Sequence, residues 1–221
     1  MPAPRLAARA ALPSRLAALR AAARRPGEAS FFFRDPHFDA DAVKVLPGEW
    51  FVHDEDIAVL TTLGSCIAAC LRDRHARVGG MNHFMLPDAE SPRDGGRLGD
   101  AGGRYGAWAM ELLINELLRR GAGRATLEAK VFGGGRVVAG MRQTNVGARN
   151  TAFVLEYLRT ERIPVVARDV GGVHPRRVCF LPASGRALVR RLAPAHAGEV
   201  LQAERAAARR AAAAAGSIDL F

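Results

Sequence analysis

Two residues, Cys66 and His83, have the types and the surroundings that nucleophilic catalysis needs. Cys66 directly follows Gly64 and Ser65, and small residues there permit a tight turn whose backbone N–H groups can face a developing negative charge. The thiolate is the reactive form of cysteine, and a nearby histidine can generate it. From spacing alone, however, a buried structural cysteine and a satisfied core histidine remain the commoner explanations.

The apolar runs around this pair predict strands that would bring it together. Residues 57–63 are typical of a buried strand, residues 66–71 predict a second strand or a short helix, and residues 78–86 predict a further strand. Adjacent strands lie about 4.8 Å apart. A contact between Cys66 and His83 is therefore geometrically reasonable.

His83 is a polar residue in an otherwise apolar strand, so its ring needs a hydrogen-bonding partner. Strand alternation places it on the same face as Met81 and Met85. A threonine hydroxyl before the Gly-Ser turn could accept the imidazole N–H and hold its tautomer, as the third member of a triad does. Thr61 and Thr62 both qualify, but they point to opposite faces of a strand, so at most one can do this. The β-propensity of threonine explains either residue without a catalytic role.

Neither a metal site nor a nucleotide site is expected. Cys66, Cys70, His75 and His83 amount to four possible ligands, but their spacing matches no standard zinc pattern. The glycines at 133–135 are not followed by the Lys-Ser/Thr of a phosphate-binding loop, and they lack the spacing of a dinucleotide fingerprint. We therefore expect neither a metal nor an organic cofactor.

The chain has 221 residues and a formal net charge of +10, and arginine is concentrated near both ends. No zinc finger and no aromatic RNA-binding signature accompanies this charge, so we attribute it to a solvated surface with basic tails rather than to nucleic-acid binding. The three cysteines describe no disulfide framework, which favours a reducing cytoplasm. No apolar run approaches the roughly 20 residues of a membrane span.

The rest of the pattern predicts an α/β sandwich in which two helices cover a mixed sheet. An amphipathic helix is expected over 105–120, with Gly121 as its C-terminal cap, and residues 88–104 before it are expected to form a loop. A second helix is expected over about 147–159. Further strands are expected over 126–132 and 162–170, with a hairpin over 177–190.

Three segments follow from this pattern. Residues 1–44 are expected to form a basic, Arg/Ala-rich N-terminal extension that is partly disordered. Residues 45–192 are expected to form the folded domain. Residues 193–221 form an Ala/Arg-rich tail for which the sequence permits either a helix or disorder.

The chain resembles the CheD family at several motifs that occur in the same order across roughly residues 45–192. The motifs are Thr61 to Cys66, Gly79 to Pro87, Glu128 to Gly135, Asn145 to Asn150, and Asp169 to Gly172. Agreement over this many ordered motifs is far more specific than any single cysteine or histidine.

The resemblance implies a single-domain, three-layer α/β/β sandwich related to the catalytic domain of the cytotoxic necrotizing factor toxins. It implies hydrolysis of selected glutamine side chains to glutamate on methyl-accepting chemotaxis receptors, without a cofactor. The catalytic cysteine and histidine of the family carry over to Cys66 and His83. The catalytic threonine carries over either to position 60, which is Leu60 here, or to Thr61, and we choose Thr61. Gly64 and Ser65 are expected to support the turn and the oxyanion.

Two other functions stay open at this point. Some members of the family bind a CheC-type phosphatase, so the chain could act mainly as a chemotaxis adaptor with little catalysis of its own. The basic ends could instead bind nucleic acid or a membrane surface, although we expect neither specific nucleic-acid binding nor membrane insertion.

Overall fold

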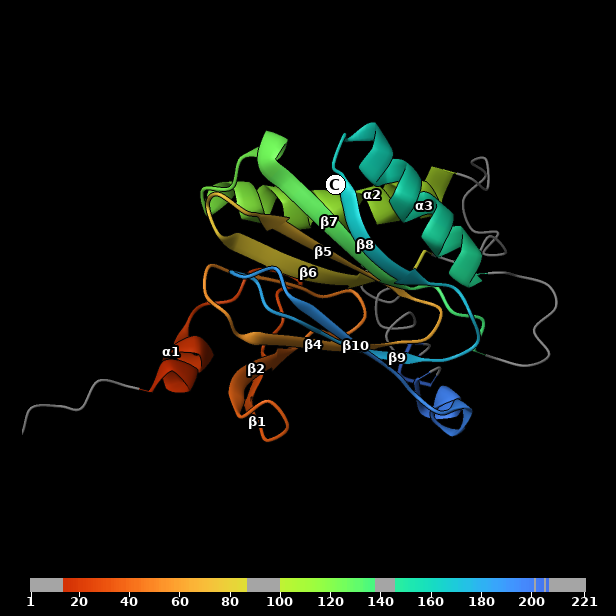
Figure 1. The fold of residues 1–221 in the computed structure, drawn as a ribbon, viewed down its shortest axis with the longest axis horizontal. Coiled ribbons are helices and arrows are strands. Elements are labelled where there is room, and N and C mark those ends of the chain that lie inside the picture. Colours follow the sequence, from red (N-terminus) through yellow and green to blue (C-terminus); the bar gives the residue numbers. More distant parts are fainter. Residues whose placement is uncertain (1–13, 87–99, 138–145, 201, 205, 207–221) are drawn as a thin grey trace, which may run out of the picture.

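The computed structural model describes residues 14–86, 100–137, 146–200, 202–204 and 206, which fold into three stacked layers (Figure 1). Its helices and strands are α1 (Arg15–Ala21), β1 (Phe31–Asp35), β2 (Ala40–Lys44), β3 (Trp50–His53), β4 (Ala58–Leu63), β5 (Ile67–Asp73), β6 (Val78–Phe84), α2 (Asp100–Arg119), β7 (Leu127–Gly133), α3 (Val146–Thr160), β8 (Val165–Val170), β9 (Arg176–Phe180) and β10 (Ala187–Arg191). Short 3-10 turns lie at Arg124–Thr126 and Pro194–His196.

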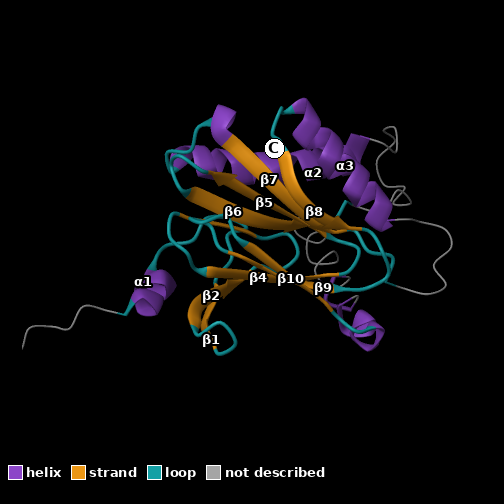
Figure 2. Ribbon diagram, in the orientation of Figure 1, coloured by secondary structure: helices purple, strands orange, loops and turns teal. Residues whose placement is uncertain are grey.

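The first sheet has the strand order β3-β6-β5-β7-β8, and helices α2 and α3 cover its outer face (Figure 2). Only its β7–β8 pair is parallel. Helix α2 buries the apolar side chains Met110, Leu113, Ile114 and Leu117, whose spacing puts them on one face of a helix. Gly121 ends this helix with φ +92, a backbone conformation that glycine adopts without steric cost.

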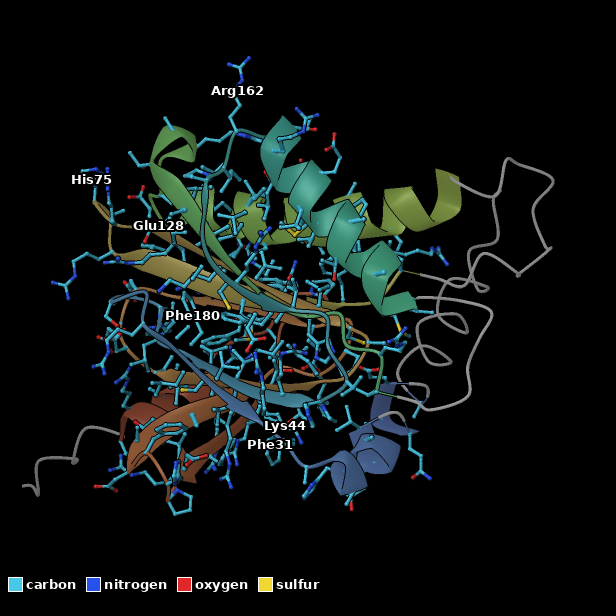
Figure 3. All side chains as sticks on the ribbon, turned by 45° about the vertical axis from the view of Figure 1, so that its right-hand side comes forward. Phe31, Lys44, His75, Glu128, Arg162 and Phe180 are labelled. Atoms are coloured by element: carbon cyan, nitrogen blue, oxygen red, sulfur yellow. The ribbon has the colours of Figure 1, made fainter. Side chains whose placement is uncertain are left out.

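The second sheet has the order β1-β2-β4-β9-β10 and packs on the inner face of the first. Its β2–β4 pair is parallel, and its other pairs are antiparallel. Side chains from both sheets fill the layer between them, and Figure 3 labels one of these, Phe180 of β9. Cys66 and Met81 belong to the same layer. The mixed α/β architecture predicted from the sequence is confirmed.

The N-terminal part of the chain departs from the sequence prediction. The sequence pattern predicts that residues 31–44 belong to a partly disordered extension, whereas they contribute β1 and β2 to the second sheet, and β2 pairs with β4. Helix α1 also contacts the domain, because Arg20 donates to the carbonyl of Phe32 at 2.8 Å. The Arg25 guanidinium likewise lies 2.8 Å from the carboxylate of Glu116 on α2. Basic residues that looked like a solvated tail thus have specific acceptors.

One further expectation needs adjustment. Helix α2 begins at Asp100, so part of the predicted 88–104 loop is helical, and residues 87–99 lie outside the described part of the chain. Of the two alternatives predicted for the segment that begins at Cys66, a strand or a short helix, the structure has the strand. Among the described residues, no helix combines the length and the apolar character needed to cross a bilayer.

Candidate active site

Cys66 lies at the point where the chain passes from one sheet to the other. Strand β4 of the second sheet ends at Leu63, and strand β5 of the first sheet begins at Ile67. The turn Gly64–Ser65–Cys66 connects them. We call these three residues the nucleophile turn. The side chain of Cys66 is fully buried between the sheets.

The glycines at the end of β7 hold this turn in place by backbone hydrogen bonds. The N–H of Gly134 donates to the carbonyl of Cys66 at 2.8 Å, and the N–H of Gly135 donates to the carbonyl of Gly64 at 2.7 Å. Gly133 has φ +108, and a Cβ added there would lie 2.1 Å from the carbonyl oxygen of Cys66. The glycine run therefore serves close backbone packing beneath the nucleophile turn.

His83 faces the nucleophile turn from the neighbouring strand. It lies on β6 opposite Ala68 of β5, and strand alternation places it with Met81 on the face that packs against the second sheet. One ring nitrogen of His83 lies within 4.8 Å of the sulfur of Cys66. The predicted meeting of these two side chains is thus present in the structure.

Thr61 contacts the other side of the imidazole. Its Oγ1 lies 2.8 Å from Nδ1 of His83 and also donates to the carbonyl of Val45 at 2.8 Å. A hydroxyl has one proton to donate, so with that proton directed at Val45 it can only accept from Nδ1–H. This assigns the proton to Nδ1 and leaves a lone pair on Nε2. The Nε2 atom has no hydrogen-bond partner among the described residues.

The choice between Thr61 and Thr62 follows from strand alternation. Val59, Thr61 and Leu63 of β4 point into the layer between the sheets, where His83 lies. Leu60 points to the opposite face of the second sheet, and Thr62 shares that orientation. Thr61 is therefore the threonine that reaches the ring.

Burial shifts the acid–base properties of both reacting groups. It lowers the pKa of His83 from 6.5 to about 4, although the nearby Glu204 carboxylate opposes this shift. Burial also raises the pKa of the Cys66 thiol well above its usual value, and Glu204 adds to that effect. In this conformation the pair is thus held as a neutral thiol and a neutral imidazole.

Glu204 is the member of the site that the sequence did not point to. It comes from the C-terminal segment and is 1 % exposed. Its Oε1 accepts from the backbone N–H of Gly64 at 2.8 Å and of Cys66 at 3.1 Å. Its Oε2 accepts from the Ser65 hydroxyl at 2.8 Å and from the Ser65 N–H at 3.2 Å. Nothing in the Ala/Arg-rich pattern of this segment distinguishes Glu204 from a surface acid.

Asn150 ties the site to helix α3. Its side-chain amide donates to the carbonyl of Ser65 at 2.8 Å, and its carbonyl oxygen accepts from the N–H of Leu86 at 3.0 Å. It therefore joins the nucleophile turn to the segment that follows β6 and His83. The sequence contained a signal for this residue, the helix-opening motif from Gly147 to Asn150, but it did not indicate a role.

One group of side chains in the described part of the chain could hold a metal ion, namely Cys66, His83 and Glu204. Both carboxylate oxygens of Glu204 already accept hydrogen bonds from N–H and O–H donors, which favours an anion rather than a cation at this position. Cys70 and His75, which completed the hypothetical ligand set, are not part of the group.

Comparison with known proteins gives consistent results. Residues 85–191 match the family model described as CheD chemotactic sensory transduction. The chain is 57% identical over 211 residues to a protein of Albidiferax ferrireducens named probable chemoreceptor glutamine deamidase CheD 1, covering 94% of this chain and 87% of that protein. A protein of Bordetella petrii named probable chemoreceptor glutamine deamidase CheD is 58% identical, covering 77% of this chain and 76% of that protein. A protein of Methylobacillus flagellatus with the same name is 45% identical, covering 87% of this chain and 96% of that protein.

Among solved structures, the hypothetical protein YfiH of Bacillus licheniformis aligns with a TM-score of 0.27 and 15% identity over 38% of this chain and 26% of that chain. This likeness is too weak to bear on fold or function.

Proposed function

Since this chain belongs to the CheD family, we propose that it hydrolyses glutamine side chains of chemoreceptors to glutamate, with Cys66 as the nucleophile and His83 as the base. The observation that carries the proposal is the junction of the two sheets. There a thiol, an imidazole with a free Nε2 and a turn of inward-facing backbone N–H groups meet. These are the parts that acyl transfer to a thiol requires.

The first half of the reaction forms a thioester. Nε2 of His83 takes the proton of the Cys66 thiol, and the thiolate attacks the side-chain carbonyl carbon of glutamine, forming a C–S bond. The carbonyl oxygen becomes an oxyanion that accepts hydrogen bonds from the N–H groups of Gly64 and Cys66. The protonated His83 then gives its proton to the amide nitrogen, and ammonia leaves as the C–N bond breaks.

The second half returns the enzyme to its starting state. His83 takes a proton from water, and the resulting hydroxide attacks the thioester carbonyl. The C–S bond breaks, and the thiolate of Cys66 is protonated by His83. The net change is glutamine and water to glutamate and ammonia, with no electron transferred and no cofactor required.

Thr61 acts in this scheme as a positioning residue. Its hydroxyl accepts from Nδ1–H of His83, which keeps the lone pair on Nε2, the nitrogen that acts as the base in this scheme. Gly64 and Ser65 support the turn whose N–H groups receive the oxyanion.

The partners follow from the same proposal. The cytoplasmic parts of chemoreceptors are the expected substrates, and a CheC-type phosphatase is a second expected partner. The relation of the fold to the cytotoxic necrotizing factor toxins and a cytoplasmic location also stay predictions.

A direct test of the proposed function incubates the purified chain with a chemoreceptor cytoplasmic fragment and follows ammonia release. Ammonia should appear in proportion to the glutamines converted, and no release with any receptor fragment would contradict the proposal.

A further inference from the structure

The nucleophile turn is occupied in this structure by a group that resembles the reaction product. The side chain of Glu204 has the same carbon skeleton as glutamine and ends in the carboxylate that deamidation creates. Its Oε1 lies against the N–H groups of Gly64 and Cys66, which is where the proposed mechanism puts the oxyanion. Its Oε2 lies against Ser65, where the departing nitrogen or the incoming water would be.

We propose that Glu204 is an intramolecular product mimic, and that the C-terminal segment carrying it closes the glutamine side-chain subsite until a substrate displaces it. The proposal rests on the deamidase function and adds a mode of regulation to the same site. The segment follows β10 and is drawn in blue in Figure 1.

The turn binds a carboxylate better than it would bind an amide. Each hydrogen bond to Glu204 from the described residues comes from a donor group, and three of these donors are backbone N–H groups that cannot reverse their role. An amide offers one oxygen as an acceptor, and its NH₂ group would face the N–H of Ser65 without a bond. A run of converging N–H groups also favours negative charge. Glutamate in this position is therefore a stronger occupant than glutamine.

The occupied site is closed both to substrate and to the first chemical step. Cys66 and His83 are 0 % and 1 % exposed, so a glutamine side chain cannot reach the sulfur while Glu204 is in place. Burial and, after it, the adjacent negative charge of Glu204 raise the pKa of the Cys66 thiol, because a second anion beside the carboxylate is unfavourable. Departure of Glu204 would remove this charge and vacate the position that the substrate side chain needs.

The segment is attached in a way that permits release. Val200 and Glu204 are its buried side chains among the described residues of 197–206, and they lie four residues apart on one helical face. Gly198, Gln202 and Ala203 are exposed. A segment whose described residues bury only two side chains opens at a lower free-energy cost than one that buries many.

The variant Glu204→Gln turns the mimic into a substrate and supplies the sharpest test. The purified variant should convert residue 204 to glutamate, a gain of about one dalton set by the exchange of an amide for an acid at the thioester step. Conversion should be first order and independent of protein concentration. The neighbouring Gln202 is exposed and should stay an amide, and the double variant with Cys66→Ser should not react.

The outcomes separate this inference from the proposed function. If the amide of the Glu204→Gln variant persists while receptor glutamines are deamidated by the same preparation, the product-mimic proposal is overturned and the deamidase function stands. If neither the introduced amide nor the receptor glutamines react, both are overturned.

A second measurement needs no receptor. We expect Glu204→Ala to speed alkylation of Cys66 by iodoacetamide roughly tenfold or more, since charge-assisted hydrogen bonds that favour the closed state are lost. The variant Glu199→Ala is the matched control, because Glu199 is an exposed acid on the same segment. Peptide mapping distinguishes Cys66 from the other buried cysteines, Cys70 and Cys179. Alkylation of Glu204→Ala at the wild-type rate would overturn the proposal.

Discussion

The hydroxyl oxygen of Thr61 lies 2.8 Å from Nδ1 of His83 and gives its own proton to the carbonyl of Val45. Because the hydroxyl can then only accept from the ring, the contact assigns the imidazole proton to Nδ1. The free lone pair on Nε2 is what a base for the Cys66 thiol requires. A hydroxyl on β4, bound to the carbonyl of Val45 just after β2, thus determines the tautomer of a histidine on β6.

Replacing this hydroxyl should weaken the base without removing it. In Thr61→Val the Nδ1–H loses its acceptor and the other tautomer becomes accessible, so we expect receptor deamidation to fall about tenfold or more. Thr61→Ser keeps the hydroxyl and should restore most of the rate. Thr62→Val is the matched control, because Thr62 points to the opposite face of β4. Equal losses in the two valine variants would contradict the role of Thr61.

Asn150 should matter for both stability and activity. In Asn150→Asp the acceptor for the Leu86 N–H remains, but the donor to the Ser65 carbonyl is replaced by a carboxylate oxygen. We expect the free energy of unfolding in urea to drop by about 2–3 kcal/mol, because a buried hydrogen bond is lost and a charge lies unpaired. Receptor deamidation should fall as the nucleophile turn loosens. Glu156→Gln on the exposed face of the same helix should change neither quantity. If Asn150→Asp has the stability and the activity of the wild-type chain, Asn150 does not hold the nucleophile turn to the segment after β6.

Substitution of Gly133 and of Gly171 by alanine distinguishes the cost of a positive φ from the cost of a steric clash. Both have positive φ, but a Cβ at Gly133 would strike the carbonyl of Cys66, whereas at Gly171 nothing lies within 4 Å. Gly171→Ala should cost about 1 kcal/mol of unfolding free energy from the backbone conformation alone. Gly133→Ala should cost clearly more than that, because the carbonyl of Cys66 must also shift to make room for the added Cβ. Similar stability of the two variants by chemical denaturation would argue against close packing beneath the turn.

The sequence was most informative where periodicity or motif order constrained the chain. The apolar spacing of residues 105–120 predicted most of helix α2, and the runs around Cys66 and His83 predicted β4 and β6 and left β5 open between a strand and a short helix. Strand alternation limited the third residue to one of two threonines, and the register of β4 shows that Thr61 contacts the ring. Local patterns suffice for such features, because side-chain direction repeats regularly along a strand.

Features that depend on distant pairing were not predictable from local pattern. Residues 31–44 look like part of a basic extension, and their place in the sheet depends on β2 pairing with β4. Glu204 lies 138 positions from Cys66 in the chain, and its neighbours are alanine and arginine. Only the folded structure brings that acid to the nucleophile turn. Composition alone made the segment resemble an ordinary solvated helix.

Acid should destabilise the fold through His83. Its pKa is about 4 in the folded protein, against an unperturbed value of 6.5, so between these values the unfolded chain binds a proton that the folded chain does not. The free energy of unfolding should therefore fall as the pH is lowered through this window, by up to about 1.4 kcal/mol per pH unit. His83→Gln should lack this contribution. The pH slope of His83→Gln should be subtracted from that of the wild-type chain, because burial also lowers the pKa of His53 and His53 adds a slope of its own to both proteins. Equal pH slopes for the two proteins would contradict a buried, neutral His83.

Mass spectrometry of a chemoreceptor cytoplasmic fragment, incubated with the wild-type chain, with Cys66→Ser or with Cys70→Ser, shows whether Cys66 attacks receptor glutamines. Both cysteines are buried and free of disulfides, but only Cys66 lies beside His83. We expect a gain of about one dalton per converted glutamine with the wild-type chain and with Cys70→Ser, and none with Cys66→Ser. Full conversion by Cys66→Ser would contradict the assignment of Cys66 as the nucleophile.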